Sequence, residues 1–338
     1  MKLRESNFEL LRLISMLFIV WYHLLLMFIV KIDDNPIYKA AYLPLHIAVI
    51  CFVLLSGYFH IKPSVRGVAR LFFPLLFYYV PLTIFEMNVS NVWGIERLLF
   101  FSKSPYWFIR TYFCLYLISP VLNSYLNSNS RRLYLLTALG FVSVYLGWYM
   151  QDSYMIDGKN LVLFMFIYVL GDCINKFKDM IDKITTSFIT VFYVTLNLFL
   201  VIGFYTFHDS IIGDNLWRWS FSYSSPVLIM NSVLFFLIFS RMHFSSRIIN
   251  WLAASVFAVY ILHHQYYILF GLIGPRVFNL YNRIDSPLFL ILSLGLFSMG
   301  IMLAFILMDK LFLPVQKMFL NFCISSELRI KNLFQCRN

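Results

Sequence analysis

The chain has 338 residues, of which 61% are hydrophobic, 20% are aromatic and only 13% are charged, and its mean hydropathy is +0.76. A soluble domain of this length does not need so much apolar surface, so the composition excludes a soluble enzyme and indicates a membrane protein. The net charge of +11 does not indicate nucleic-acid binding, because the chain has no basic, aromatic-interleaved soluble surface to carry it.

Ten apolar stretches follow one another along the chain and predict an all-α bundle of about ten transmembrane helices. They cover residues 8–30, 40–60, 71–86, 106–122, 132–150, 160–173, 187–206, 225–240, 250–271 and 287–309. The first stretch is flanked by Lys2 and Arg4 and lacks a small-residue cleavage site, so we expect a retained helix rather than a signal peptide.

The basic residues predict how this bundle is oriented. Most of the 27 lysines and arginines fall in cytoplasmic segments if the N-terminus lies inside, as the positive-inside rule requires. Both termini are then cytoplasmic, and the excess positive charge faces anionic membrane lipid. We expect residues 1–314 to form the transmembrane domain and residues 315–338 to form a basic, amphipathic cytoplasmic tail.

The first apolar stretch contains two ionisable residues, Arg12 and His23, and such residues inside a membrane segment usually mark function. Eleven residues make about three helical turns, so both side chains lie on one face, ~16 Å apart along the axis. Glu9 lies on the same face, three residues before Arg12, either as part of the site or only as a structural ion pair. A neutral histidine next to an apolar wall is well suited to act as a general base.

The second stretch ends with Ser56, Gly57 and Tyr58, and a short basic segment with Arg66 and Arg70 follows it. Because Gly57 has no side chain, another backbone or a ligand can approach closely at this point. The two arginines suit bidentate binding of a phosphate-bearing cytoplasmic ligand. Alternatively, they only set the topology and contact lipid headgroups.

Two later stretches carry further polar groups. Trp107 and Arg110 lie on one helix face, which is typical either of a sugar-binding surface or of an aromatic belt with a snorkelling arginine. On a continuous ninth helix, His263 lies ~20 Å into the membrane, and His23 lies ~22 Å in. We therefore expect the two rings to flank one reacting centre, with His264 facing elsewhere in a structural role.

These residues resemble the membrane acyltransferase family called acyltransferase 3, which includes polysaccharide and lipopolysaccharide O-acetyltransferases, and the resemblance spans nearly the whole chain. Five motifs carry it: Glu9 and Arg12 with His23, Ser56-Gly57-Tyr58, Arg66 and Arg70 before a helix led by Pro74, Tyr106-Trp107-Phe108-Ile109-Arg110, and Tyr260 with His263.

The resemblance implies transfer of an acyl group, commonly acetyl from cytoplasmic acetyl-CoA, to a hydroxyl of a cell-surface polysaccharide or its lipid-linked precursor. It places the protein in the bacterial cytoplasmic membrane, with acyl-CoA as a co-substrate and with no bound cofactor or metal. The implied catalytic residues are His23, Glu9 and Arg12. The implied acyl-CoA-binding residues are Arg12, Arg66, Arg70, Ser56, Gly57 and Tyr58, and the implied acceptor-binding residues are Trp107, Arg110, Tyr260 and His263.

Two other classes of function compete with this interpretation. A transporter or flippase for a glycan or lipid-linked sugar would use the same polar residues as a path. Such proteins carry discontinuous helices in two matching halves, and the sequence shows no such pairing. A scaffold of a polysaccharide assembly complex would leave the stripe from Arg12 to His23 unexplained.

Overall fold

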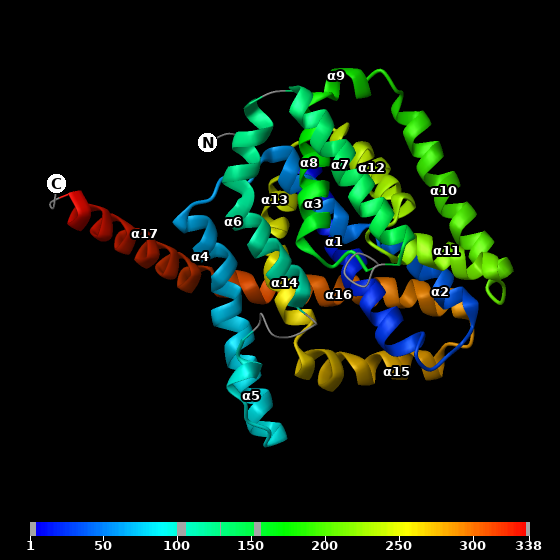
Figure 1. Ribbon diagram of the computed structural model, residues 1–338. Coiled ribbons are helices and arrows are strands. Elements are labelled where there is room, and N and C mark those ends of the chain that lie inside the picture. The colour runs from blue at the N-terminus through cyan, green and yellow to red at the C-terminus, as the bar shows by residue number, and fades with distance from the viewer. Residues whose placement is uncertain (1–4, 100–105, 129, 152–156, 336–338) are drawn as a thin grey trace.

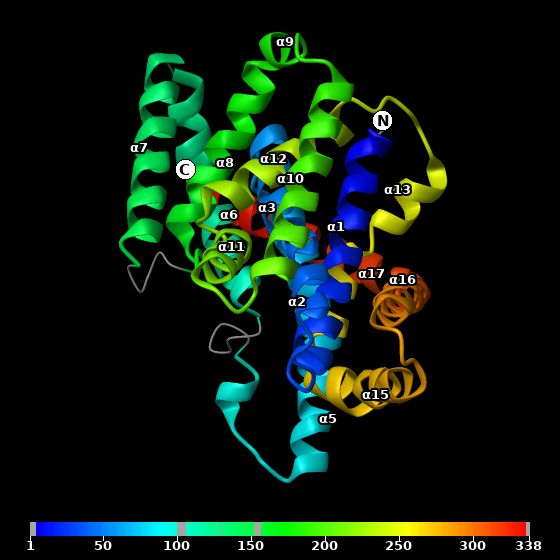
Figure 2. The ribbon, with the colours of Figure 1, turned by 90° about the vertical axis from the view of Figure 1, so that its right-hand side faces the viewer.

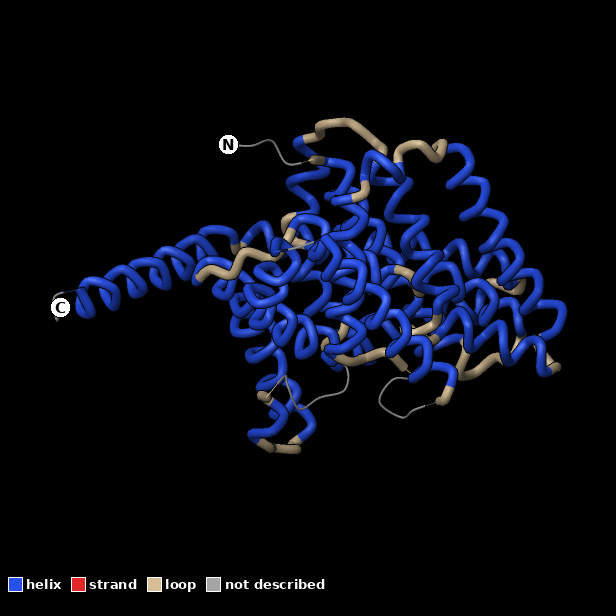
Figure 3. Tube along the Cα trace, turned by 45° about the horizontal axis from the view of Figure 1, so that its top comes forward, coloured by secondary structure: helices blue, strands red, loops and turns tan. Residues whose placement is uncertain are grey.

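The computed structural model describes residues 5–99, 106–128, 130–151 and 157–335, and within these ranges every regular element is helical (Figure 3). The predicted all-α class is confirmed for this part of the chain. Lys2, Arg4 and residues 336–338 of the predicted tail lie outside the described residues.

A helix lies at each of the ten predicted stretches. The α-helices are α1 Ser6–Leu24, α2 Pro36–Tyr42, α3 Ala48–Phe59, α4 Val65–Pro74, α5 Val80–Ser90, α6 Trp107–Ser128, α7 Ser130–Tyr149, α8 Leu161–Lys176, α9 Lys178–Ile181, α10 Thr186–Phe207, α11 Ile211–Phe221, α12 Pro226–Ser240, α13 Arg247–Ala253, α14 Val256–His263, α15 Gly274–Arg283, α16 Pro287–Leu311 and α17 Leu313–Gln335. The π-helical turns η1 Leu25–Ile29, η3 Leu75–Tyr79 and η6 Tyr267–Ile273 continue α1, join α4 to α5 and precede α15, and the 3-10 turn η2 Leu43–Leu45 links α2 to α3.

The length and composition of these helices indicate a multi-pass membrane protein. Within the described ranges, five helical segments are long and apolar enough to cross a membrane, or up to seven if each of two bent pairs counts as one span. The count of ten spans and the cytoplasmic position of both termini stay predictions.

Helices α1 and α3 form the centre of the bundle (Figures 1 and 2). Helix α1 contacts α3, α12, α13, α14 and α16, and α3 packs along α8. The α3–α8 contact is close because glycines face backbone there: a Cβ on Gly57 would lie 2.0 Å from the carbonyl oxygen of Tyr168, and one on Gly171 would lie 2.4 Å from that of Leu54. Small residues allow such close approach of membrane helices.

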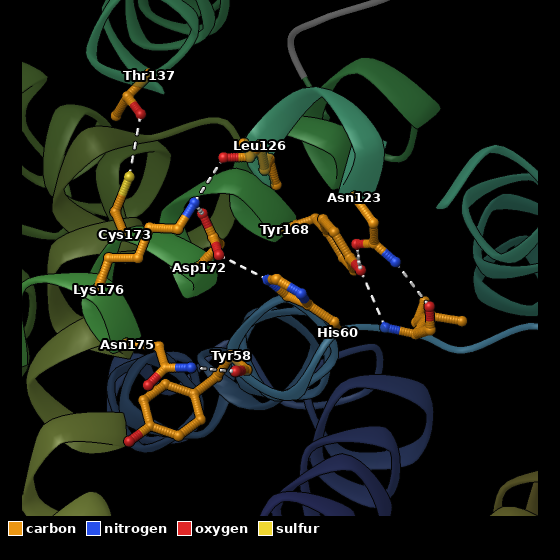
Figure 4. A network of polar contacts seen from close by, with 11 residues as sticks. Tyr58, His60, Asn123, Leu126, Thr137, Tyr168, Asp172, Cys173, Asn175 and Lys176 are labelled. Carbon is orange, nitrogen blue, oxygen red and sulfur yellow. Dashed lines mark hydrogen bonds and ion pairs between the residues drawn. The ribbon is translucent and has the colours of Figure 1, made fainter. Parts of the chain in front are cut away.

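A polar network holds the C-terminal end of α3 against α8 and α6 (Figure 4). His60 Nε2 donates to Asp172 Oδ1 at 2.6 Å, and Lys176 Nζ forms an ion pair with Asp172 Oδ2 at 3.0 Å. Lys176 also donates to the carbonyl oxygen of Leu126 at 2.8 Å. The buried Asp172 is therefore compensated from two sides, as a buried carboxylate must be. His60 has φ of 57°, so these contacts hold the turn in a conformation that non-glycine residues rarely adopt.

The third predicted stretch is wrong at its N-terminal end, because the helix begins at Val65 rather than near residue 71. The Ser64 side chain accepts a hydrogen bond from Gly67 N–H and caps the first turn. Arg66 and Arg70 therefore lie on α4, not in a loop, and Pro74 ends this helix instead of opening it. The π-helical turn η3 follows directly after the proline, which cannot donate a backbone hydrogen bond.

The ninth predicted stretch, residues 250–271, is not one continuous helix. The segments Arg247–His263 and Tyr267–Arg283 are bent by 83° relative to each other. Gln265 explains the break, since its side-chain oxygen accepts from Ile268 N–H at 3.1 Å while its amide donates to Glu86 at 3.2 Å. The side chain thus caps the second segment and ties the break to α5.

The predicted tail is a helix, α17, that projects from the body of the bundle (Figure 1). Its N-terminal part packs on α4, where the rings of Phe319 and Phe73 lie 5.7 Å apart. Exposed Met318 and Phe322 lie on the same helix and form an apolar groove with α4. These features agree with an amphipathic segment.

Gly57→Ala should destabilise the protein by about 1–3 kcal/mol, because the new methyl group must displace the backbone of α8. Thermal unfolding of the detergent-solubilised protein measures the effect. Gly300→Ala, on α16, is the matched control: a Cβ there meets no atom within 4 Å, and replacing a helical glycine favours the helix. Equal melting temperatures for the two variants would contradict the close α3–α8 contact.

Candidate active site

A cavity of about 300 Å³ runs beside α1, enclosed by α3, α4, α6, α13 and α14; we call it the Arg12 cavity. Along α1 its lining residues are Arg12, Met16, Ile19, Tyr22 and His23, which are three or four residues apart except for the adjacent Tyr22 and His23. This spacing is one face of a helix. The predicted stripe from Arg12 to His23 is therefore confirmed, and it lines a cavity rather than a helix contact.

Arg12 lies at the opposite end of this cavity from His23, and its side chain is 38% exposed. Its Nη1 donates to Glu9 Oε1 at 3.0 Å, as the spacing of three residues predicts. The Glu9 side chain is only 7% exposed and does not line the cavity. Glu9 therefore fixes the orientation of the guanidinium group.

His23 meets two other histidines at the far end. Its Nδ1 lies 3.0 Å from His263 Nε2, so the expectation that these two residues share one depth is confirmed. The ring of His264 stands nearly perpendicular to that of His23, with the ring centres 4.7 Å apart. Both His23 and His263 are buried.

A second cavity, of about 250 Å³, lies on the other side of His23; we call it the His46 cavity. Four residues line both cavities: Tyr22, His23, Trp107 and His264. His23 therefore lies where the two cavities meet, and a group bound in either one can contact its ring.

The walls of the His46 cavity are mainly aromatic. The ring of His46 stacks on Tyr223 with centres 4.3 Å apart and on Phe221 at 5.1 Å. Its Nδ1 bonds the Tyr42 hydroxyl at 2.8 Å, and its Nε2 is buried. Lys159 and its ion-pair partner Asp157 complete the lining. Flat apolar faces with a few polar groups are typical of a ligand site.

One of the comparisons with known proteins identifies a family. The family described as "Acyltransferase domain" matches residues 5–309, which is most of the chain and includes every candidate residue discussed so far. The chain belongs to the acyltransferase 3 family. No curated protein and no solved structure matches it.

The structure brings only some of the predicted donor-side residues of this acyltransferase into the Arg12 cavity. Arg12 and Ser56 line it. Gly57 instead faces the backbone of α8, so it is a backbone that approaches there and not a ligand. Tyr58 packs among aromatic rings outside the cavity, and its carbonyl oxygen accepts from Asn175.

Arg66 and Arg70 are also not cavity-lining residues. Both are exposed on α4, one turn apart, and the same helix contributes Leu71 to the Arg12 cavity. The two guanidinium groups are thus carried by a wall of the cavity without entering it.

Only some of the predicted acceptor-side residues line a cavity. Trp107 lines both cavities and Tyr260 lines the Arg12 cavity, whereas Arg110 is exposed and lines neither. Trp107 and Arg110 therefore do not line one cavity, and the exposed arginine agrees with the alternative of an aromatic belt with a snorkelling arginine. His263 lines neither cavity, because its ring lies behind that of His23.

His264 is the residue that the sequence analysis assigned wrongly. On a continuous helix it would point about 100° away from His263. Both cavities lie on that side of α14, so the His264 ring lines both, whereas His263 lies behind His23. His46 and Tyr223 were also missed, because a cavity assembled from α1, α2, the residue His46 before α3 and the end of α11 with the turn after it leaves no local sequence signal.

A buried carboxylate braces the helix break beside the Arg12 cavity. Asp309 accepts from Tyr78 Oη at 2.8 Å and from Ser255 Oγ at 2.5 Å. Ser255 precedes α14, and its neighbours Ala254 and Val256 line the cavity. Asp309 thereby joins α16 and η3 to the start of the helix that carries Tyr260 and the histidines.

Asp309→Ala should lower the free energy of unfolding by about 1.5–3 kcal/mol, because two buried hydroxyls lose a charged acceptor. Unfolding of Asp309→Ala, Ser255→Ala and the double variant forms a double-mutant cycle that measures the coupling. Ser255→Ala should cost little once Asp309 is absent, and fully additive losses would contradict the brace.

Proposed function

We propose that this membrane protein is an O-acyltransferase that moves an acyl group, most commonly acetyl, from acyl-CoA in the Arg12 cavity to a glycan hydroxyl in the His46 cavity. The observation that carries the proposal is the position of His23, where the two cavities meet. A transfer reaction needs both substrates at one catalytic group, and this arrangement admits each from its own side.

The Arg12 cavity suits the acyl-pantetheine arm of the donor. It is lined largely by apolar side chains such as Met16, Ile19 and Phe52, and the axis from Arg12 to His23 measures ~16 Å. The Arg12 guanidinium group, oriented by Glu9, suits a phosphate group at the open end. Arg66 and Arg70 on α4 add positive charge for the nucleotide part of CoA, which we place outside the cavity.

The His46 cavity suits a sugar ring of a polysaccharide or of a lipid-linked precursor. Tyr223, Phe221 and Trp107 present aromatic rings, on which the apolar face of a pyranose stacks. The ammonium group of Lys159 supplies hydrogen bonds for hydroxyl groups.

His23 supplies the proton transfers in this proposal. Its unprotonated nitrogen takes the proton of the acceptor hydroxyl as the oxygen attacks the thioester carbonyl carbon. The C–S bond then breaks, and the proton on His23 passes to the leaving CoA sulfur. The products are an acyl ester and free CoA, and the histidine returns to its neutral form.

The orientation follows from the basic residues and gives the cellular setting. With the N-terminus inside, the open end at Arg12 faces the cytoplasm, where acyl-CoA is found, and the His46 cavity faces outward. We therefore place the protein in the bacterial cytoplasmic membrane, acting on a glycan destined for the cell surface.

A glycan or lipid-linked sugar flippase is the second candidate, and the bent helix pairs favour it. The pair α11–α12 is bent by 50°, and the segments Arg247–His263 and Tyr267–Arg283 are bent by 83°. Both breaks lie in the C-terminal half, however, whereas transporters carry corresponding breaks in matching halves. A flippase would move glycan across sealed vesicles without consuming acyl-CoA.

His23→Gln should lower the transfer rate by about 10²–10⁴-fold, because the amide cannot take a proton. The measurement is transfer of radiolabelled acetyl from acetyl-CoA to glycan in membranes that contain each variant. His208→Gln, an exposed histidine on the far part of α10, is the control and should keep the wild-type rate. Unchanged labelling by His23→Gln, at equal protein level, would contradict the proposed role.

Substitutions in the two cavities should separate the two substrates. Ser56→Phe narrows the Arg12 cavity and should raise KM for acetyl-CoA about 10-fold, with little change in KM for the glycan that accepts label. His46→Leu should raise KM for that glycan to a similar extent and leave the acetyl-CoA value unchanged. The opposite pattern would mean that donor and acceptor sides are exchanged.

A further inference from the structure

The hydrogen bonds around His263 decide which nitrogen of His23 carries a proton. His263 Nδ1 lies 2.9 Å from the carbonyl oxygen of Val259. A carbonyl oxygen only accepts hydrogen bonds, so Nδ1 of His263 must carry the proton. No acidic side chain contacts either ring in the described part of the chain, and burial disfavours a charged imidazole, so both rings are neutral at rest.

The second nitrogen of a neutral histidine is an acceptor. His263 Nε2 therefore accepts, and the 3.0 Å contact requires that His23 Nδ1 carries a proton and donates it. His23 Nε2 is then unprotonated. This nitrogen has no hydrogen-bond partner among the described residues, and it is not one of their solvent-inaccessible side-chain atoms that lack a partner. Its lone pair therefore faces the cavities that His23 lines.

We infer that His263 is a positioning residue that holds His23 in the tautomer with a free Nε2. The chain of bonds runs from the Val259 carbonyl through His263 to His23 and ends at the reacting nitrogen. An inward-facing acceptor behind a general-base histidine has the role that the buried carboxylate has in a Ser-His-Asp triad, with a neutral ring in its place.

The arrangement also acts after proton transfer. When His23 Nε2 takes the acceptor proton, the ring becomes positively charged, while its Nδ1–H stays bound to the lone pair of His263. A hydrogen bond to a charged donor is stronger than one to a neutral donor. His263 therefore binds the protonated form of His23 more tightly than the resting form, without touching either substrate.

The effect of His263 on catalysis rests on the proposed acyl transfer, but the tautomer of His23 can be measured without any substrate. The protein contains seven histidines, and long-range 1H–15N correlation spectra of histidine-labelled protein in detergent distinguish the protonated from the unprotonated ring nitrogen of each. The spectrum of His23→Phe identifies the signals of His23 by their loss.

Two substitutions of equal length separate the hydrogen bond from the packing. His263→Gln places an amide oxygen where Nε2 accepts, whereas His263→Met fills a similar volume without a strong acceptor. Wild type and His263→Gln should show His23 protonated at Nδ1. In His263→Met, the proton should move to Nε2, and acetyl transfer should fall about 10- to 100-fold in kcat with little change in KM.

A wild-type His23 that carries its proton on Nε2, or a His263→Met spectrum identical to that of wild type, would overturn the inference. Absence of acetyl transfer by wild-type protein together with the expected tautomer would overturn the proposed function and leave the role of His263 intact.

Discussion

The hydrogen bond between His23 and His263 is the constraint on which the rest of the site depends. A ring nitrogen buried in an apolar bundle must find its partner within the protein. This bond meets that need at the point where α1 passes α14, and it leaves the other nitrogen of His23 exposed to two cavities. The same contact thus joins two helices distant in sequence and defines the junction of the two cavities.

Breaks in the helices shape the cavities around this contact. Helix α14 is short because the chain interrupts it at Ser255 and again after His263, and each interruption exposes backbone groups that need partners. Polar side chains hold both breaks: Asp309 accepts from the Ser255 hydroxyl, and Gln265 caps the following segment while its amide donates to Glu86.

The network around Asp172 has a comparable purpose at the other end of the central helices. It fixes the turn after α3 (Figure 4). The glycines on α3 and α8 hold these helices in close contact. Ser56 lines the Arg12 cavity and lies one residue before Gly57, which contacts α8. The position of this part of the cavity wall therefore depends on the α3–α8 contact. Packing and site are coupled through a single turn of helix.

The sequence was sufficient where a regular helix carries the information. The face shared by Arg12 and His23, the Glu9–Arg12 pair and the matched depth of His263 all follow from constant helical geometry. It was insufficient where the helix stops being regular. The cap at Ser64 and the turn after His263 depend on single side-chain hydrogen bonds, which hydropathy does not reveal.

The His46 cavity marks a second limit of the same kind. Its walls come from the end of α11 and the turn after it, from α2 and His46, and from Asp157 and Lys159, segments that only the tertiary fold brings together. Arg110 shows that helical spacing alone does not place a side chain in a cavity. A spacing of three residues puts it near Trp107 on the helix surface, yet the direction of its side chain is set by neighbouring elements, and it lies outside the cavities.

The most direct test of the account is a density map of the protein with a thioether analogue of acetyl-CoA, which cannot transfer its acyl group. We predict that the pantetheine arm follows α1 from Arg12, with the acyl carbon next to His23 Nε2 and the His46 cavity free for the acceptor. An arm bound in the His46 cavity, or one that ends away from His23, would contradict the central claim that two substrates meet at this histidine.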